Sequence, residues 1–310
     1  MEIGMMLVNQ IAAMAIMVLA GFGLAKRGLL TGEQTKVISA VLLYVIIPCS
    51  LIDAFNTRFE PEKVQGMLVS LLLAVAVFAL FLAVGTLLGK RGFTPGEVCC
   101  LIYSNCGNLI IPIVTGVLGA EYVIYSCAYM LVQNLLTWTH ARMVLGGEAD
   151  LTVKKVVTNP CVLSILVGLV LFLMRIELSG PLGGAIEGLG GCIGPLFMLV
   201  TGVLLAEADV KGALSSRWTY LVLGLRLILL PLSVMGLLWA AGQLWADPRR
   251  NGVFLVLLLC ASGPPATTLA QIAQMFGSGE SRYISTLTAV STVLSAVTMP
   301  VMCLLLQMVI

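Results

Sequence analysis

The chain has 310 residues, of which 59% are hydrophobic and 10% are charged, and its formal net charge is +2. So few polar side chains cannot cover a soluble globule, and the mean hydropathy of +1.06 is typical of an integral membrane protein. The weak positive charge, with no long basic block, gives no reason to expect a nucleic acid as partner. The nine cysteines show no CxxC spacing. We therefore expect buried apolar thiols, with no metal site and no cofactor.

Ten apolar segments follow one another along the chain. Nearly all exceed the length of about 18 to 20 residues that a helix needs to cross a bilayer, and the alternating pattern of an outer-membrane barrel is absent. The sequence therefore predicts an all-α membrane protein. The predicted spans are 5–25, 35–55, 64–89, 97–118, 122–143, 156–175, 185–206, 218–244, 252–275 and 283–309.

A polar stretch in the middle of the chain, residues 144–155, divides these spans into two sets of five. An odd number of spans in each half predicts that the halves have inverted topology. We therefore expect one five-helix repeat at 1–143, a cytoplasmic linker at 144–155, and a second repeat at 156–310.

Lysine and arginine indicate the orientation, because they favour cytoplasmic loops. They are more numerous in the odd-numbered loops, which include Lys26, Arg27, Lys90 and Arg91, than in the even-numbered loops. Both termini are therefore predicted to lie on the outer, non-cytoplasmic side of a plasma or inner membrane. Lys26 and Arg27 follow the first apolar run, and no small-residue cleavage site stands out, so we interpret this run as a retained span.

Two predicted spans, the fourth and the ninth, are interrupted by glycine and proline about half a chain apart. A glycine next to a proline opens the helical hydrogen-bond ladder, and a membrane tolerates the freed backbone groups only where protein or a cavity satisfies them. Matching breaks in two halves predict a binding site near the bilayer midplane. The candidate residues of the breaks are Asn105, Gly107, Asn108, Pro112, Gly263, Pro264 and Pro265.

The chemistry of these breaks favours an anionic ligand. A broken helix places a half-helix amino terminus, with its partial positive charge, near the midplane, where an anion can meet it. Uncharged hydrogen-bonding side chains surround the breaks, although such groups could also serve only to satisfy the freed backbone. They are Ser104, Asn105 and Asn108 in the first break and Ser262, Thr267 and Thr268 in the second. The breaks contain no carboxylate, which argues against a pure cation exchanger.

Four further polar residues lie within predicted spans. Arg226 is deep in the eighth span, where an arginine costs about 2.5 to 3.5 kcal/mol on insertion scales. It must be compensated, either by an anionic substrate or by a structural contact with a carboxylate or with helix-end carbonyls. Gln133 and Asn134 in the fifth span are candidates for substrate binding. His140 is interpreted as a solvated interfacial histidine, with a proton relay as the alternative.

These motifs together resemble the auxin efflux carrier family. The resemblance rests on Asn105-x-Gly107-x-x-x-x-Pro112, on Asn159-Pro160 at the start of the sixth span, and on the Gly-Pro-Pro-Ala sequence at 263–266. The segments 44–48 and 226–231 extend it over the whole chain. No single motif is specific, but their order and spacing are. Asn108 departs from the family pattern, which usually has a bulkier or apolar residue there.

The resemblance implies a scaffold of spans 1, 2, 6 and 7 and a transport domain of spans 3–5 and 8–10, in which spans 4 and 9 cross at their breaks. It implies carriage of organic anions, as in plant auxin carriers and bacterial carriers of malate or malonate, and it suggests a homodimer. Carried over to this chain, Asn105, Pro112, Asn159 and either Pro264 or Pro265 would lie at or near the substrate. Gly107 and Asn108 would then be the positions that set selectivity.

We therefore expect a secondary carrier of small carboxylates that works by alternating access in the lipid bilayer. The alternative is a sodium- or proton-coupled symporter or antiporter on the same crossover architecture. An enzyme is not expected, because His140 has no HExxH context and no GxSxG element occurs. A sensor that resembles a transporter would require a separate signalling partner.

Overall fold

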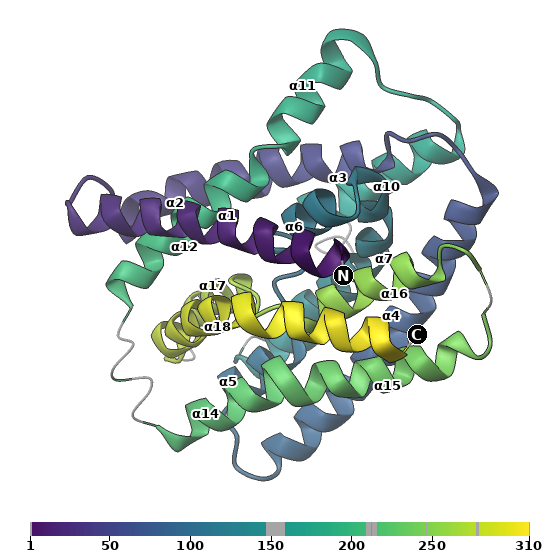
Figure 1. Cartoon of the computed structure of the whole chain (residues 1–310). Coiled ribbons are helices and arrows are strands. Elements are labelled where there is room, and N and C mark those ends of the chain that lie inside the picture. Colours follow the sequence, from purple (N-terminus) through teal and green to yellow (C-terminus); the bar gives the residue numbers. More distant parts are fainter. Residues whose placement is uncertain are drawn as a thin grey trace.

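The computed structural model describes residues 2–146, 159–208, 212, 216–245, 247–276 and 279–309. Within these ranges the regular secondary structure is helical apart from one isolated antiparallel bridge, and turns or irregular segments connect the helices (Figure 1). Most of the predicted linker at 144–155, including Lys154 and Lys155, lies outside the described residues.

The predicted first half contains eight α-helices and three shorter turns of 3-10 or π-helix. They are α1 (Glu2–Lys26), α2 (Gly32–Val41), η1 (Leu42–Ile46), α3 (Ile47–Phe55), α4 (Pro61–Gly89), α5 (Pro95–Ile102), α6 (Ile110–Val117), η2 (Ala120–Tyr122), α7 (Val123–Leu136), η3 (Thr137–Ala141) and α8 (Arg142–Val144). In the second half the described helices are α10 (Pro160–Leu173), α11 (Gly180–Gly190), α12 (Ile193–Glu207), α14 (Arg217–Gly224), η4 (Leu225–Leu229), α15 (Leu230–Gly242), α16 (Arg250–Ser262), α17 (Thr268–Met275) and α18 (Ser281–Val309).

Six helical stretches within the described residues are long and apolar enough to cross a membrane, which confirms a multi-pass membrane protein. They are Met5–Lys26, Gly32–Phe55, Pro61–Gly89, Gly180–Glu207, Arg217–Gly242 and Ser281–Val309. Pro160–Leu173 and Arg250–Ser262 are apolar but shorter. The total of ten spans therefore stays a prediction, as do the inverted halves and the side of the membrane on which each terminus lies.

Polar residues at the helix starts explain several boundaries. Thr31 and Thr94 each form a capping box, in which the threonine side chain accepts from the third helical N–H and a glutamine or glutamate side chain accepts from the threonine N–H. Asn159 caps α10 directly before Pro160, and proline is suited to a first helical position because its missing N–H would be unpaired there.

Two π-helical turns, η1 and η4, carry long helices through prolines. Pro48 and Pro231 each follow such a turn by two residues. A proline ring clashes with the carbonyl four residues earlier, which here lies inside the widened turn. The π-turn accommodates this clash, so the helix continues past the proline in each case.

The helices pack in two groups. In the first group, α1 and α2 pack against α12, and α3 packs against α10 and α11. In the second, α4 packs against α5, α7 and α16, while α18 packs against α16 and α17. Figure 1 shows α1, α2, α3, α11 and α12 in the upper part of the view and α5, α14, α15 and α18 in the lower part. The first group comprises the predicted spans 1, 2, 6 and 7.

Candidate functional site

The two predicted helix breaks are present as irregular segments, residues 103–109 between α5 and α6 and residues 263–267 between α16 and α17. The segments pair with each other through their backbones. The Asn105 N–H donates to the Pro264 carbonyl at 2.8 Å, and the Ala266 N–H donates to the Tyr103 carbonyl at 3.0 Å. Together these bonds form an antiparallel bridge between Ser104 and Pro265. Each break therefore satisfies part of the backbone that the other leaves open.

Gln133 of α7 holds the first break in place. Its Oε1 accepts from the Ser104 N–H at 3.2 Å and from the Ser104 hydroxyl at 3.0 Å, and its Nε2 donates to the Ser104 carbonyl at 2.7 Å. Both side chains are buried. The side-chain amide of Gln133 thus satisfies both the N–H and the carbonyl of Ser104, as a neighbouring strand would.

Gln133→Leu is expected to lower the free energy of unfolding by about 3 kcal/mol, because it leaves the buried N–H and carbonyl of Ser104 without their side-chain partner. The measurement is the thermal midpoint of the purified protein in detergent. Asn134→Leu is the matched control: the Asn134 amide donates to the Met130 carbonyl of its own helix at 2.9 Å, and its loss should matter little. Equal midpoints for both variants would contradict the role given to Gln133.

Arg226 joins the ends of two broken helices. Its side chain is fully buried. Nε and Nη2 donate to the Gly263 carbonyl at 3.0 and 2.8 Å, and Nη1 donates to the Leu101 carbonyl at 3.0 Å. These carbonyls lie at the carboxyl ends of α16 and α5, where the helix dipole is negative. The contact with helix-end carbonyls is one of the compensations that the sequence left open.

Other candidates from the sequence make local structural contacts. The Asn159 Oδ1 accepts from the Cys161 N–H at 2.9 Å and so caps α10. The Pro112 carbonyl accepts from Gln10 of α1 at 3.1 Å. Gly107 lies half-buried in the first break, and a side-chain carbon added there would approach Met130 to 3.2 Å. Gly263, Pro264 and Pro265 are buried where the two breaks pair.

His140 is partly buried and lies against the first break. Its Nδ1 is 2.9 Å from the hydroxyl of Tyr103, and that hydroxyl also lies 3.1 Å from the Leu136 carbonyl. Tyr103 is the first residue of the break. The histidine is therefore linked to the break itself, a contact that the interpretation as a solvated interfacial residue did not include.

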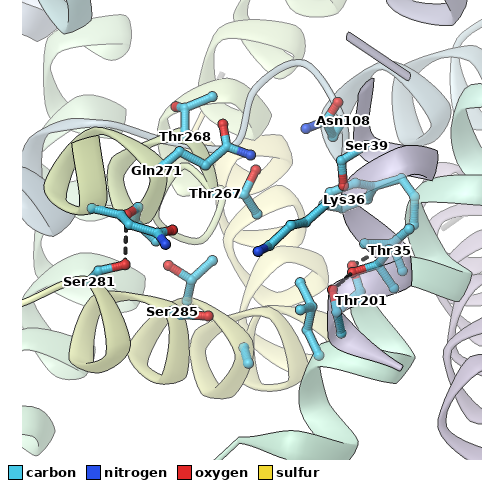
Figure 2. A pocket seen from close by; sticks show the side chains of 18 of the residues that line it. Thr35, Lys36, Ser39, Asn108, Thr201, Thr267, Thr268, Gln271, Ser281 and Ser285 are labelled. Atoms are coloured by element: carbon cyan, nitrogen blue, oxygen red, sulfur yellow. Dashed lines mark hydrogen bonds between the residues drawn. The ribbon is translucent and has the colours of Figure 1, made fainter. Parts of the chain in front are cut away.

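A cavity of about 910 Å³ opens beside the breaks (Figure 2). Its walls come from α2 and η1, from α12, from α17 and from the first half of α18, while Asn108 and Thr267 of the two breaks line its inner part. Among the candidate residues of the two breaks from the sequence, Asn108, Thr267 and Thr268 line it. Figure 2 shows the Asn108 amide nitrogen directed toward Gln271 across the cavity.

Two buried oxygens of residues that line the cavity, Asn108 Oδ1 and Thr288 Oγ1, have no hydrogen-bond partner among the described residues. Buried polar atoms are nearly always paired, so unpaired atoms beside a cavity indicate a place where a polar ligand or water binds. The inner part of the cavity also includes Thr267 and Thr268, at the amino end of α17. A helix amino terminus favours an anion there.

Most polar residues of the cavity were missed by the sequence analysis. One signal could have found some of them: α18 carries Ser281, Ser285, Thr288 and Thr292 at helical spacing along one face. A polar stripe in an otherwise apolar span marks a face turned toward water or ligand. Other lining residues, such as Ser39, Thr201 and Gln271, are single polar positions without such a pattern.

The charges at the cavity favour anions. Its lining includes two cationic side chains, Lys36 and Arg282, and one carboxylate, Glu207. Glu207 is engaged with the start of α2, where its Oε1 accepts from the Gly32 N–H at 2.7 Å. The lining side chains alone sum to one positive charge, which attracts anions, and Glu33, just outside the lining, pairs with Lys36 and reduces this surplus. Within the described part of the chain, no group of three His, Cys, Asp or Glu side chains could hold a metal ion.

A smaller hollow of about 310 Å³ lies near the starts of α4 and α16. There Arg249 binds the Glu60 carboxylate, and the Lys63 Nζ is 3.5 Å from Glu60 Oε1. The hydrogen bond from Arg249 lowers the pKa of Glu60 from its ordinary value. Any stability from this lowered pKa is present above the ordinary pKa of glutamate and is lost as the pH falls. Because the Glu60 side chain is partly exposed, solvent screens the effect.

A family model described as membrane transport protein matches this chain at residues 6–153 and again at residues 148–303. The two matches together cover nearly the whole sequence. No curated protein matches the chain.

Proposed function

Because the chain belongs to the auxin efflux carrier family of membrane transport proteins, we propose that it is a secondary carrier of small organic anions. In this proposal the two broken helices form the crossover of a substrate site, and the cavity beside them admits a carboxylate. The protein has no catalytic residues, lies in the plasma or inner membrane with both termini outside, and works as a homodimer.

One observation carries the proposal: residues of both breaks line the same cavity. Asn108 comes from the first break, and Thr267 comes from the second. The amide nitrogen of Asn108, the threonine hydroxyls and the amino end of α17 are hydrogen-bond donors, which is what a carboxylate requires. A buried lysine is not needed at such a site, because the helix end supplies the positive potential.

The position of the cavity supports alternating access. One wall, formed by α2, η1 and α12, belongs to the first packing group, and the opposite wall, formed by α17 and α18, belongs to the second. Movement of one group against the other would close the cavity around a fixed site, which is how carriers with broken helices work.

Coupling to sodium or to a proton is the alternative on the same architecture. Carbonyls at broken helices hold sodium in such carriers, whereas here Arg226 already donates to the Leu101 and Gly263 carbonyls. The hydrogen bond between His140 and Tyr103 links a titratable side chain to the first break. This contact favours a proton over sodium as the coupling ion.

Asn108→Ala is expected to remove most of the stabilisation that a bound carboxylate gives, with at least a tenfold loss of affinity. In the wild-type protein, a carboxylate at a hundred times its Kd should stabilise the folded state by about 2.7 kcal/mol. Without ligand the variant should have the wild-type midpoint, because Asn108 Oδ1 bonds to no described residue. The measurement is a thermal-shift titration against mono- and dicarboxylates, with and without sodium.

Asn134→Ala is the control, since its amide bonds within α7 and does not line the cavity. An undiminished carboxylate shift in Asn108→Ala would reject this cavity as the substrate site. A shift from sodium or pH alone, with none from any carboxylate, would favour the cation-coupled alternative.

A further inference from the structure

Lys36 is the charged residue of α2 that lines the cavity. The lining face of this helix and the following turn includes Gly32, Lys36, Ser39 and Leu43, spaced by three or four residues. Figure 2 shows the Lys36 side chain extending into the cavity, with its ammonium group toward the side that carries Thr267 and Ser285. The lysine therefore faces the same space as the residues of the second break.

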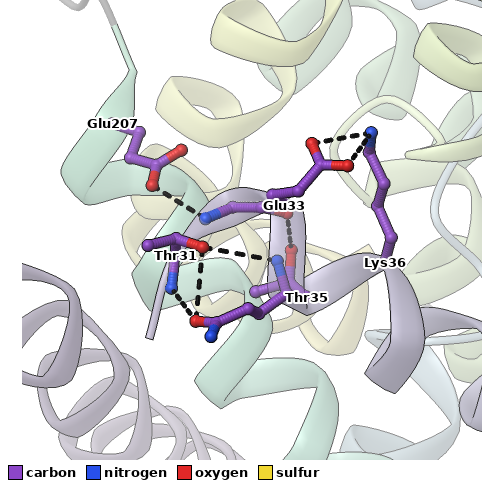
Figure 3. Close-up of polar contacts among 7 residues, drawn as sticks. Thr31, Glu33, Thr35, Lys36 and Glu207 are labelled. Carbon is purple, nitrogen blue, oxygen red and sulfur yellow. Dashed lines mark hydrogen bonds and ion pairs between the residues drawn. The ribbon is translucent and has the colours of Figure 1, made fainter. Parts of the chain in front are cut away.

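The backbone that carries Lys36 is fixed (Figure 3). Thr31 and Gln34 form the capping box of α2, and Glu207 of α12 accepts from the Gly32 N–H at 2.7 Å. The Thr35 hydroxyl donates to the Gly32 carbonyl at 2.6 Å. The first turn of α2 is thus held by its own cap and by α12. The long Lys36 side chain takes no part in these contacts, so it can change its partner without moving the helix.

The present partner of Lys36 is replaceable. The Lys36 Nζ lies 3.0 and 2.9 Å from the two carboxylate oxygens of Glu33, three residues earlier on the same helix. The side chains are 63% and 80% exposed, and an exposed pair of this kind adds little stability. Glu33 itself is not part of the cavity lining. A carboxylate that enters the cavity can therefore take the place of Glu33 at small cost.

We propose that Lys36 binds a second carboxylate of the substrate, so that the cavity is a dicarboxylate site; this rests on the proposed function as an anion carrier. One carboxylate is held at the inner end by Asn108 and the amino end of α17. The other carboxylate gives up its contacts with water, binds the Lys36 ammonium and displaces Glu33 from it. A monocarboxylate meets only the inner contacts and leaves the Lys36–Glu33 pair intact.

The test compares matched ligands that differ by one carboxylate: succinate with butyrate, and malate with 3-hydroxybutyrate. Kd values come from thermal-shift titration of the full chain at constant ionic strength. Lys36→Gln is expected to raise the Kd of succinate and malate about tenfold and to change the Kd of the monocarboxylates less than twofold. Glu33→Gln removes the carboxylate that competes with the substrate for Lys36, and it is expected to lower the Kd of the dicarboxylates about threefold. Lys36→Arg should keep most of the affinity.

Lys26→Gln is the charge-matched control. Lys26 lies at the end of α1, donates to the Ala206 carbonyl at 3.2 Å and does not line the cavity. If Lys26→Gln weakens dicarboxylate binding as much as Lys36→Gln does, the effect comes from the net charge of the protein and the inference is overturned. It is also overturned if Lys36→Gln and Glu33→Gln change affinity in the same direction. If no carboxylate of either kind binds to the wild-type protein, the proposed function fails together with the inference.

Discussion

Arg226→Gln is expected to lower the free energy of unfolding by at least about 3 kcal/mol, because a fully buried charge with three donated hydrogen bonds is removed. Glutamine is shorter and cannot reach the Leu101 and Gly263 carbonyls together. Two helix ends would then be left facing each other with their negative dipoles uncompensated. The expected result is a protein that is largely aggregated after extraction in detergent.

The measurement is the thermal midpoint, together with the monodisperse fraction in size-exclusion chromatography. Arg226→Lys keeps the positive charge but loses the planar fork that donates to two carbonyls, so we expect an intermediate loss. Arg217→Gln is the control within the same membrane-spanning stretch, Arg217–Gly242. Arg217 lies at the start of α14, with its guanidinium 5.6 Å from the Trp218 ring centre, and its replacement should change the midpoint little.

The same variant separates the two compensations that the sequence allowed for Arg226. If Arg226→Gln folds with the wild-type midpoint and yet binds no carboxylate, the guanidinium serves the substrate and not the helix ends. If it is destabilised and the folded fraction keeps the wild-type Kd, the role is structural. The geometry favours the second outcome, because the guanidinium is fully buried and each of its three nitrogens already donates to the Gly263 or Leu101 carbonyl.

The sequence predicted the helix breaks correctly because their cause is local. Glycine and proline weaken the hydrogen-bond ladder at their own positions, and where they occur close together, as at Gly107 to Pro112 and at Gly263–Pro264–Pro265, the sequence indicates an interruption. The apolar runs likewise predicted a multi-pass membrane protein, because bilayer thickness fixes the length of a spanning helix. Neither conclusion needs knowledge of which helices touch.

Several roles of polar residues could not be predicted, because they depend on a partner far away in the chain. Gln133 was a candidate for substrate binding, and the structure pairs it with Ser104. Asn159, by contrast, caps its own helix, a local role that its place directly before Pro160 could have indicated. Lys36 was not among the candidate residues from the sequence. Its place in the cavity depends on how α2 lies against α12, which no local pattern encodes.

The second large effect is expected at Gly202, where α12 meets α1. A side-chain carbon at Gly202 would overlap the Val18 carbonyl oxygen and would lie 2.7 Å from the Phe22 nitrogen. Gly21 of α1 is equally close to the Leu199 carbonyl of α12. Because backbone atoms cannot turn aside as a flexible side chain can, the helices must separate along their contact. Close packing through small residues is the usual way in which membrane helices associate.

Gly202→Ala is therefore expected to lower the free energy of unfolding by about 3 kcal/mol, and Gly21→Ala by a similar amount. Gly23→Ala is the matched control in α1, because nothing lies within 4 Å of its added carbon. The thermal midpoint of the three variants, measured without ligand, gives the comparison. Midpoints for Gly202→Ala and Gly23→Ala that coincide would show that α1 and α12 do not pack this closely.

The Gly202 variant also bears on the mechanism, since α1 and α12 belong to the first packing group. In the proposed carrier this group is the static frame, and the broken helices move against it. A frame that is only loosened should lose stability while its folded fraction keeps the wild-type Kd for monocarboxylates, because the contacts proposed for them, at Asn108 and Thr267, lie on the moving part. A large change in Kd would instead mean that α1 and α12 move relative to each other during transport.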